Sequence, residues 1–280
     1  MYKRQILLRT AKAAHERHNI FPRFSPTLIT NNEQRLTNND LPVPNSYFQF
    51  KQFRVEQDRC AMKVCTDSCV FGAYVEVGEA QRILDIGTGT GLLSLMVAQR
   101  SGASIDAVEI NPEAQQQAQE NFAASPWSER LHLHQQSLQE FARQERPKYD
   151  LILSNPPFFL SSLKSPDAAR NTAKHTGELL FEDILFFAQQ HLTEQGRLYL
   201  LLPPAEALYF AGLAKASDLY LQEALQVFTY HGGKCIRHIQ TYTFAPETAP
   251  VLKDFFIREE DKVTYTSEFR QLLQPYYLYL

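Results

Sequence analysis

The chain has 280 residues, of which 44% are hydrophobic and 21% are charged, and this length supports one substantial hydrophobic core with an appendage. Its formal net charge of −3 excludes a protein that binds nucleic acid with its whole surface, so an RNA or DNA partner would have to meet local basic patches. No apolar run approaches the roughly 18 residues of a membrane span and no secretory leader pattern is visible, so we expect a cytoplasmic protein without membrane contact.

The first 45 residues differ in composition from the rest of the chain. Residues 1–20 are strongly basic, with Glu16 as their single acid, and residues 31–46 are rich in Asn, Pro and Thr. A segment of this composition buries too little apolar surface to order itself. We therefore expect a basic, disordered extension and linker over residues 1–45 and one catalytic domain over residues 46–280. A short RNA-contacting helix or a transit-like leader is an alternative for residues 1–20.

From residue 47 onward the sequence alternates between strand and helix patterns. Partly alternating aromatic residues indicate strand structure near 47–55, and an apolar run at 70–77 indicates a helix. Apolar runs predict further strands at 82–86, 104–109, 131–135, 149–154 and 197–202, and helices at 91–100, 111–123, 137–143, 179–192 and 205–216. A Gly-Gly turn at 231–234 between the segments 220–230 and 236–244 predicts a hairpin. The chain is thus predicted to form a Rossmann-like α/β fold, with helices on both faces of a mostly parallel seven-stranded sheet that ends in an antiparallel hairpin.

The turn after the strand at 82–86 has the pattern Gly87-x-Gly89-x-Gly91. The dinucleotide fingerprint G-x-G-x-x-G would place its third glycine at Leu92, so the spacing disfavours a pyrophosphate ligand. Glycines here allow the backbone to approach a ligand that lacks phosphate. A tight turn that needs glycine only for its geometry is the alternative explanation.

Two acids accompany this turn. Asp85 ends the first strand and can accept a hydrogen bond from an ammonium group, and Glu109 ends the next strand, where a carboxylate can bind both hydroxyls of a ribose. Together with the glycine turn, these acids predict a site for S-adenosylmethionine.

Two further segments are candidates for this cofactor site. Thr66 and Asp67 precede the helix-like run, where they either cap the helix or line the cofactor pocket. The strand at 131–135 is followed by Gln136 and Ser137, where an acid would accept a hydrogen bond from the adenine amine of the cofactor. Either residue can substitute through its side chain or backbone.

The tetrapeptide Asn155-Pro156-Pro157-Phe158 follows the strand at 149–154. It lies where open α/β sheets bind ligands, at the carboxyl ends of the strands. If the Asn155 side-chain carbonyl and the Pro156 backbone carbonyl each accept one N–H, they orient the lone pair of an exocyclic amine toward a methyl sulfonium. The prolines fix the backbone, Phe158 stacks on the substrate ring, and Asn155 also borders the cofactor. A simple strand terminator is the alternative.

Basic side chains gather in two loops that we expect near the open edge of the sheet. A base in a folded RNA must be swung out of its stack to reach a pocket of this kind, and its phosphates then need cationic partners. The predicted RNA-binding residues are Lys63, Lys164, Arg170, Lys174, His175, Lys234 and Arg237. Ordinary solvated loops are the alternative for each patch.

With these residues in view, the chain from about Phe48 to Leu280 resembles the bacterial tRNA(Val) adenine-N6 methyltransferase family. The resemblance is carried by residues 50–53, 57–67, 85–91 and 155–158 and by matches between Arg170 and Asp183. It implies a class I methyltransferase that uses S-adenosylmethionine to methylate adenine 37 of tRNA(Val), which it would bind at the anticodon stem-loop. The missing acid after the third strand and residues 1–45 depart from the family pattern.

Other functions share parts of these motifs. A glutamine-N5 methyltransferase acting on a release factor uses the same tetrapeptide, as do other rRNA and DNA amino-methyltransferases, and a non-catalytic cofactor-binding protein is a third class. The four cysteines match neither a zinc pattern nor a disulfide framework. We therefore expect free thiols, no metal, and a monomer.

Overall fold

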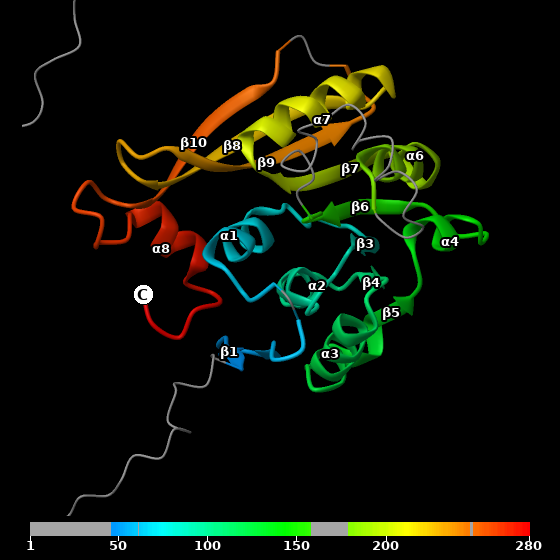
Figure 1. The fold of residues 1–280 in the computed structure, drawn as a ribbon, viewed down its shortest axis with the longest axis horizontal. Helices are drawn as coiled ribbons and strands as arrows, with labels where there is room; N and C mark the ends of the chain where they lie inside the picture. The colour runs from blue at the N-terminus through cyan, green and yellow to red at the C-terminus, as the bar shows by residue number, and fades with distance from the viewer. Residues whose placement is uncertain (1–45, 61, 158–178, 247–248) are drawn as a thin grey trace, which may run out of the picture. The chain divides into compact units, whose positions relative to one another are not determined.

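The computed structural model describes residues 46–60, 62–157, 179–246 and 249–280 (Figure 1). The expectations for residues 1–45, for Phe158 and for the basic residues between 158 and 178 lie outside these ranges. No helix within them has the length and apolar character needed to cross a bilayer.

The predicted Rossmann-like α/β fold is confirmed. Its main sheet has the strand order β10-β8-β9-β7-β6-β3-β4-β5. All neighbouring strands are parallel except β9, which runs antiparallel to both β7 and β8. The strands are β3 (Arg82–Ile86), β4 (Ser104–Glu109), β5 (Leu131–Gln135), β6 (Tyr149–Ser154), β7 (Leu192–Leu202), β8 (Tyr220–Tyr230), β9 (Cys235–Thr243) and β10 (Val251–Arg258). The sheet therefore has one strand more than the seven expected, because β10 joins the edge beside β8.

Helices cover both faces of the sheet, and each face has its own hydrophobic core (Figure 1). Neighbouring residues of one strand point to opposite faces, so that Ile83 of β3 belongs to one core and Leu84 to the other. The first core contains residues of α1 (Thr66–Tyr74), α2 (Leu92–Ala98), α3 (Pro112–Ala123) and α8 (Ser267–Leu273). The second contains residues of α4 (Leu138–Ala142), α6 (Phe181–His191) and α7 (Pro204–Ala216). A short 3-10 helix, η1 (Ser128–Arg130), precedes β5.

Helix starts follow local chemistry at α3 and α4 but not at α1. Asn111 caps α3 by accepting from the backbone N–H groups of Glu113 and Ala114, and Pro112 occupies the first helical position. Ser137 and Glu140 form a capping box at α4. The expectation that Thr66 and Asp67 cap the helix after them is wrong, because α1 already begins at Thr66 and its N-cap is Cys65, which makes no side-chain cap bond.

The amino-terminal part of the described domain packs against its carboxyl terminus. The expected strand structure near residue 50 is a separate hairpin of β1 (Tyr47–Gln49) and β2 (Arg54–Glu56). Phe50 forms an isolated bridge with Tyr277, and the Lys51 backbone N–H donates to the Tyr276 carbonyl over 2.8 Å. The Tyr276 hydroxyl donates to the carbonyl of Met96 in α2 over 3.0 Å. These contacts fix the β1–β2 hairpin and α2 against the carboxyl terminus.

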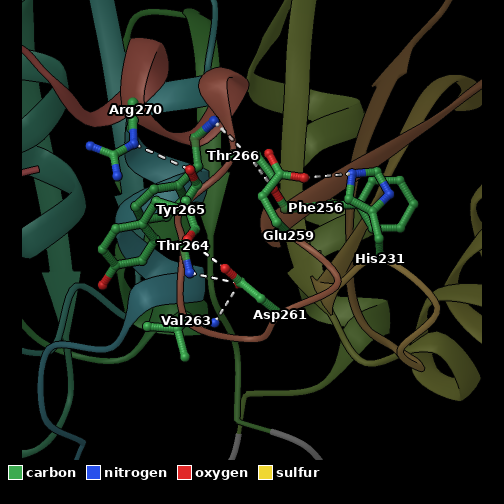
Figure 2. A network of polar contacts seen from close by, with 10 residues as sticks. His231, Phe256, Glu259, Asp261, Val263, Thr264, Tyr265, Thr266 and Arg270 are labelled. Atoms are coloured by element: carbon green, nitrogen blue, oxygen red, sulfur yellow. Dashed lines mark hydrogen bonds and ion pairs between the residues drawn. The ribbon is translucent and has the colours of Figure 1, made fainter.

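The connection between β10 and α8 is held by local polar contacts (Figure 2). The Asp261 carboxylate accepts from the backbone N–H groups of Val263 and Thr264, each over 2.8 Å. Thr266 caps α8 and donates its hydroxyl to the Phe256 carbonyl over 2.6 Å, which ties the helix to the edge strand. The His231 ring of the β8–β9 turn stacks on the Phe256 ring, with 3.9 Å between their centroids. The edge strand is thereby joined to both the hairpin and the terminal helix.

The strand register shows where the sheet extends furthest. Ser154 at the end of β6 lies opposite Leu200, Leu200 opposite Gln240, and Gln240 opposite Ala224. From Ala224, β8 continues for six residues to Tyr230. At roughly 3.3 Å per residue, the β8–β9 hairpin overhangs the end of β6 by about 20 Å. The turn at 231–234 therefore lies on the carboxyl side of the sheet, where it was predicted.

Gly91 and Gly232 provide a matched pair for testing how the turn after β3 packs. Both have φ of +83°, so a side chain strains the backbone equally at either position, by about 1–2 kcal/mol. A Cβ at Gly91 would lie 2.4 Å from Cε1 of Phe122, whereas no described atom lies within 4 Å of a Cβ at Gly232. We expect Gly91→Ala to lower the free energy of unfolding clearly more than Gly232→Ala, as measured by urea denaturation. Equal losses would contradict the close packing of Gly91 on α3.

Candidate active site

A cavity of about 450 Å³ opens at the carboxyl ends of β3, β4 and β6. This volume lies within the range of sites for small molecules and cofactors. The predicted site residues that line it are Lys63, Gly87, Gly89, Glu109, Gln136, Ser137, Asn155 and Pro157. The cavity thus unites the glycine turn with the Asn-Pro-Pro segment, as the sequence predicts.

Asp85 lies directly beneath the glycine turn and is fully buried. Its Oδ2 accepts hydrogen bonds from the Thr88 hydroxyl over 2.6 Å and from the Ser94 hydroxyl over 2.8 Å. Its Oδ1 is buried and accepts no hydrogen bond from the described part of the chain. Burial raises the pKa of Asp85 to about 6, although the bonds from Thr88 and Ser94 act in the opposite direction. Asp85 does not itself line the cavity, so it would act on a cationic ligand group only from beneath the turn.

The glycines of the turn have different tasks. Gly87, Gly89 and Gly91 all have positive φ, which residues with a Cβ adopt only at a cost. A Cβ at Gly89 would meet no described atom within 4 Å, so the backbone there borders open space in the cavity. Gly91 instead packs on Phe122, as described above. Gly89 therefore leaves room for a ligand, while Gly91 allows the turn to approach α3.

Glu109, at the end of β4, is hydrogen-bonded to the glycine turn that follows β3. One carboxylate oxygen accepts from the Gly89 backbone N–H over 2.9 Å, and the other accepts from the backbone N–H groups of Ile110 and Asn111 over 2.9 and 2.8 Å. A carboxylate offers about four acceptor positions, so three are already in use. One position remains for a ribose hydroxyl, and the predicted contact with both hydroxyls requires that the Gly89 N–H be released.

The segment after β5 reaches the cavity where the usual acid is absent. Ser137 is committed to the capping box, because its hydroxyl and backbone N–H both contact the Glu140 carboxylate. Gln136 accepts from the Gln144 side chain through its Oε1 over 3.2 Å, which leaves its amide N–H groups available as donors. Of the two predicted substitutes, Gln136 has the freer side chain.

The amide of Asn155 is held in a defined position. Its Nδ2 donates to the Ser68 hydroxyl oxygen over 3.2 Å and to the Met62 sulfur over 3.7 Å. Its Oδ1 is buried, and none of the described residues donates to it. The side chain therefore presents a free acceptor beside the cavity, which is what a substrate N–H group requires.

The remaining predicted residues lie in different surroundings. Thr66 and Asp67 do not line the cavity. Asp67 instead forms an ion pair with Arg237 of β9, with 2.9 Å between Oδ2 and Nε. Lys63 lines the cavity, and its ammonium group donates a hydrogen bond to the Gln57 carbonyl. Lys234 is exposed in the β8–β9 turn.

Several residues that shape the cavity were not predicted. Ser68 and Met62 contact Asn155, and two buried polar side chains of α3 hold the segment that forms one wall. Asn121 donates to the carbonyls of Glu56 and Thr90, and Gln117 accepts from the Arg59 backbone N–H over 3.1 Å. In the sequence, α3 reads as a polar, solvated helix, so nothing marks Gln117 and Asn121 as buried.

Thiol chemistry is unsupported at this cavity. Cys60 lines it, but burial raises the pKa of its thiol to about 11. A thiol with this pKa stays protonated near neutral pH and is a poor nucleophile. All four cysteines are free, as expected.

Comparison with known proteins identifies the chain's relatives. A family described as "Methyltransferase small domain" matches residues 66–207. A protein of Cytophaga hutchinsonii named tRNA1(Val) (adenine(37)-N6)-methyltransferase is 45% identical over 244 residues, which cover 85% of this chain and 100% of the relative. The chain belongs to the tRNA1(Val) (adenine(37)-N6)-methyltransferase family. Another protein of this name, from Dyadobacter fermentans, is 46% identical over 84% of this chain and 98% of its own length.

Solved structures support the fold of this methyltransferase family member. A predicted O-methyltransferase from Agrobacterium tumefaciens superimposes with a TM-score of 0.52 at 17% sequence identity, covering 75% of this chain and 96% of its own. At this identity the likeness concerns the fold alone. It agrees with the class I methyltransferase architecture predicted from the sequence.

The pKa of Asp85 predicts a pH dependence of stability. Because its pKa rises from 3.8 in the unfolded chain to about 6 in the fold, the folded state holds the proton more tightly, and stability falls as pH rises through this window. The full difference of about two pKa units corresponds to ~3 kcal/mol. In urea titrations of the ligand-free protein from pH 4 to 7.5, we expect wild type to lose up to this amount relative to Asp85→Asn. Parallel stability curves for the two proteins would contradict the assignment.

Proposed function

We propose that this protein transfers a methyl group from S-adenosylmethionine to the N6 amine of adenine 37 in tRNA(Val). The observation that carries the proposal is the free, buried Oδ1 of Asn155 beside a cavity that also contains the glycine turn. Membership of the family agrees with it, because relatives over 40% identical carry the name of this activity.

The residues around the glycine turn suit S-adenosylmethionine. When bound, the cofactor would supply an electrophilic methyl group on a sulfonium. The unpaired Oδ1 of Asp85 attracts the cationic amino acid end, and the remaining acceptor position of Glu109 takes a ribose hydroxyl. Gln136 offers amide donors toward the adenine end, in place of the usual acid.

The Asn-Pro-Pro segment acts on the substrate amine. The lone pair of an adenine N6 is delocalised into the ring, so the amine is a weak nucleophile. When Asn155 Oδ1 and the Pro156 carbonyl each accept one N–H, the nitrogen becomes more tetrahedral and its lone pair is directed at the methyl group. No strong base is needed, because orientation and hydrogen bonding supply the rate increase. Phe158 is the proposed stacking partner of the base.

The RNA is proposed to lie on the carboxyl side of the sheet. Lys63 at the cavity and Lys234 and Arg237 on the hairpin border this side, and the basic residues of the 158–178 loop complete the proposed set. The anticodon stem-loop is the proposed ligand because its loop presents adenine 37 without a paired partner. We further propose that the enzyme acts as a monomer in the cytoplasm.

The decisive experiment supplies labelled S-adenosylmethionine to the full chain with unmodified tRNA(Val) or with a release factor. We expect label in tRNA(Val) that digests to N6-methyladenosine, and a loss of about 10²–10³-fold in kcat for Asn155→Ala, because one oriented acceptor of the transition state is removed. Binding of the cofactor to Asn155→Ala, measured by calorimetry, should remain close to wild type.

Two controls define the substrate. A tRNA(Val) transcript with guanosine at position 37 should accept no label if the proposed nucleotide is correct. Label that appears only in the release factor would show that the pocket methylates a glutamine N5 amide, and it would overturn the proposal.

Lys234 tests the proposed RNA surface. Because it is exposed and carries one positive charge, Lys234→Ala should weaken tRNA binding on all tRNA sequences and reduce the slope of log K against log salt by about 1. Lys215→Ala is the matched control, since that exposed lysine lies in the last turn of α7, away from the carboxyl edge. Filter binding over a salt series measures both. Equal effects of the two substitutions would argue against a docking role for the hairpin.

A further inference from the structure

The amide of Asn155 can occupy its site in two orientations that differ by 180°, and only one directs an acceptor toward the substrate. The contact with Ser68 does not by itself choose between them, because a hydroxyl can either donate to Oδ1 or accept from Nδ2. A reversed amide would place N–H groups toward the substrate amine, where they would repel its hydrogens. Some further element must therefore set the direction of the Ser68 hydroxyl.

The residues behind Ser68 set this direction. The Ser68 hydroxyl oxygen lies 3.0 Å from the Cys65 sulfur, and the Cys65 thiol is hydrogen-bonded to the Asp67 carboxylate. Asp67 is ion-paired with Arg237 over 2.9 Å. An ionised carboxylate only accepts, so the Cys65 S–H donates to Asp67 and its sulfur accepts from the Ser68 O–H. The Ser68 oxygen is then left to accept from Nδ2 of Asn155.

Burial and charge maintain these donor and acceptor roles of Ser68, Cys65 and Asn155. Ser68 is 4% exposed, so water does not compete for its hydroxyl. Burial, followed by the negative charge of Asp67, raises the pKa of the Cys65 thiol and keeps its proton available as a donor. The second amide hydrogen of Asn155 has the Met62 sulfur as its partner, and a sulfur of this kind accepts only.

We propose that Arg237, Asp67, Cys65 and Ser68 form a one-way hydrogen-bond chain that fixes the Asn155 amide with Oδ1 toward the substrate amine. Within this chain they are positioning residues, because they act on the substrate amine only through Asn155. The proposal rests on the proposed function, since it deepens the role of Asn155. Asp67 and Arg237 do not line the cavity, and the proposal gives them a role that does not require contact with a ligand.

Ser68→Ala is the first test. Without the hydroxyl, only the long contact with the Met62 sulfur holds the amide, so we expect single-turnover kcat to fall about tenfold while KM for tRNA and Kd for the cofactor stay within twofold. Ser68→Thr, which keeps the hydroxyl, should retain activity. Ser125→Ala removes another buried serine hydroxyl, which donates to the Phe122 carbonyl and accepts from the Trp127 backbone N–H away from the cavity, and it should leave kcat unchanged.

Cys65 tests the direction of the chain. Cys65→Ser keeps both a donor and an acceptor and should remain active, whereas Cys65→Ala should reproduce the loss of kcat seen in Ser68→Ala. Urea denaturation of each variant separates this effect from a loss of folding. If Cys65→Ala is folded and fully active, the chain does not orient Asn155 and the proposal is overturned.

A double-mutant cycle with Asn155→Asp gives the sharpest readout. A carboxylate has two acceptor oxygens and needs no orientation, so Ser68→Ala should cost less than twofold in that background but about tenfold in the Asn155 background. An equal cost in both backgrounds would show a merely structural role for Ser68. Wild type that methylates no adenine in tRNA would instead refute the proposed function, which keeps the two failures distinct.

Discussion

Two carboxylates on neighbouring parallel strands hold the one turn on which the site depends. Asp85 accepts hydrogen bonds from the hydroxyls of Thr88 in the turn and Ser94 in α2. Glu109 accepts one from the Gly89 backbone N–H. A backbone with positive φ at three glycines has little intrinsic preference for a single shape. Hydrogen bonds to charged groups are among the strongest in proteins, so these contacts hold the glycine turn in one conformation without a ligand.

The opposite side of the cavity is assembled from parts of the chain that lie far apart in sequence. Asn121 and Gln117 of α3 hold the segment after β2, and this segment leads into the start of α1. The carboxyl terminus supports the preceding β1–β2 hairpin and α2 through Tyr276. Buried amides that satisfy backbone groups of another segment specify one arrangement, because any other leaves polar groups unpaired. The segment after β6 therefore borders the same cavity as residues that α3 holds in place.

The sequence predicted the sheet strands up to β9 and the shape of the cofactor turn because these depend on local patterns. The run from Arg82 to Ile86 and the glycines after it carry both the strand and the turn within a dozen residues. The start of α1 was placed wrongly because the types of Thr66 and Asp67 favour a cap, while the chain turns into the helix one residue earlier. No element was predicted after residue 244, although Val251–Arg258 contains an apolar run that forms the edge strand.

Interactions between distant residues account for the rest. Asp67 and Arg237 are 170 positions apart, and neither residue type indicates the other as its partner. Pairing of β9 with β8, in which Arg237 lies opposite Val227, is part of what places the arginine beside the start of α1. Likewise, Ser68 reads as one more helix-start residue until β6 places Asn155 against it. Side chains of this kind become functional through topology, which single-sequence patterns do not encode.

The overhang of the β8–β9 hairpin beyond β6 limits the paths by which a large molecule can reach Asn155. The hairpin is braced by β10 through a ladder along its length and by the stacked rings of His231 and Phe256, so it does not bend aside as a free loop would (Figure 2). A large partner that approaches Asn155 from the carboxyl side therefore comes beside the hairpin as well. The same strands that complete the sheet thus form part of the surface that such a partner encounters.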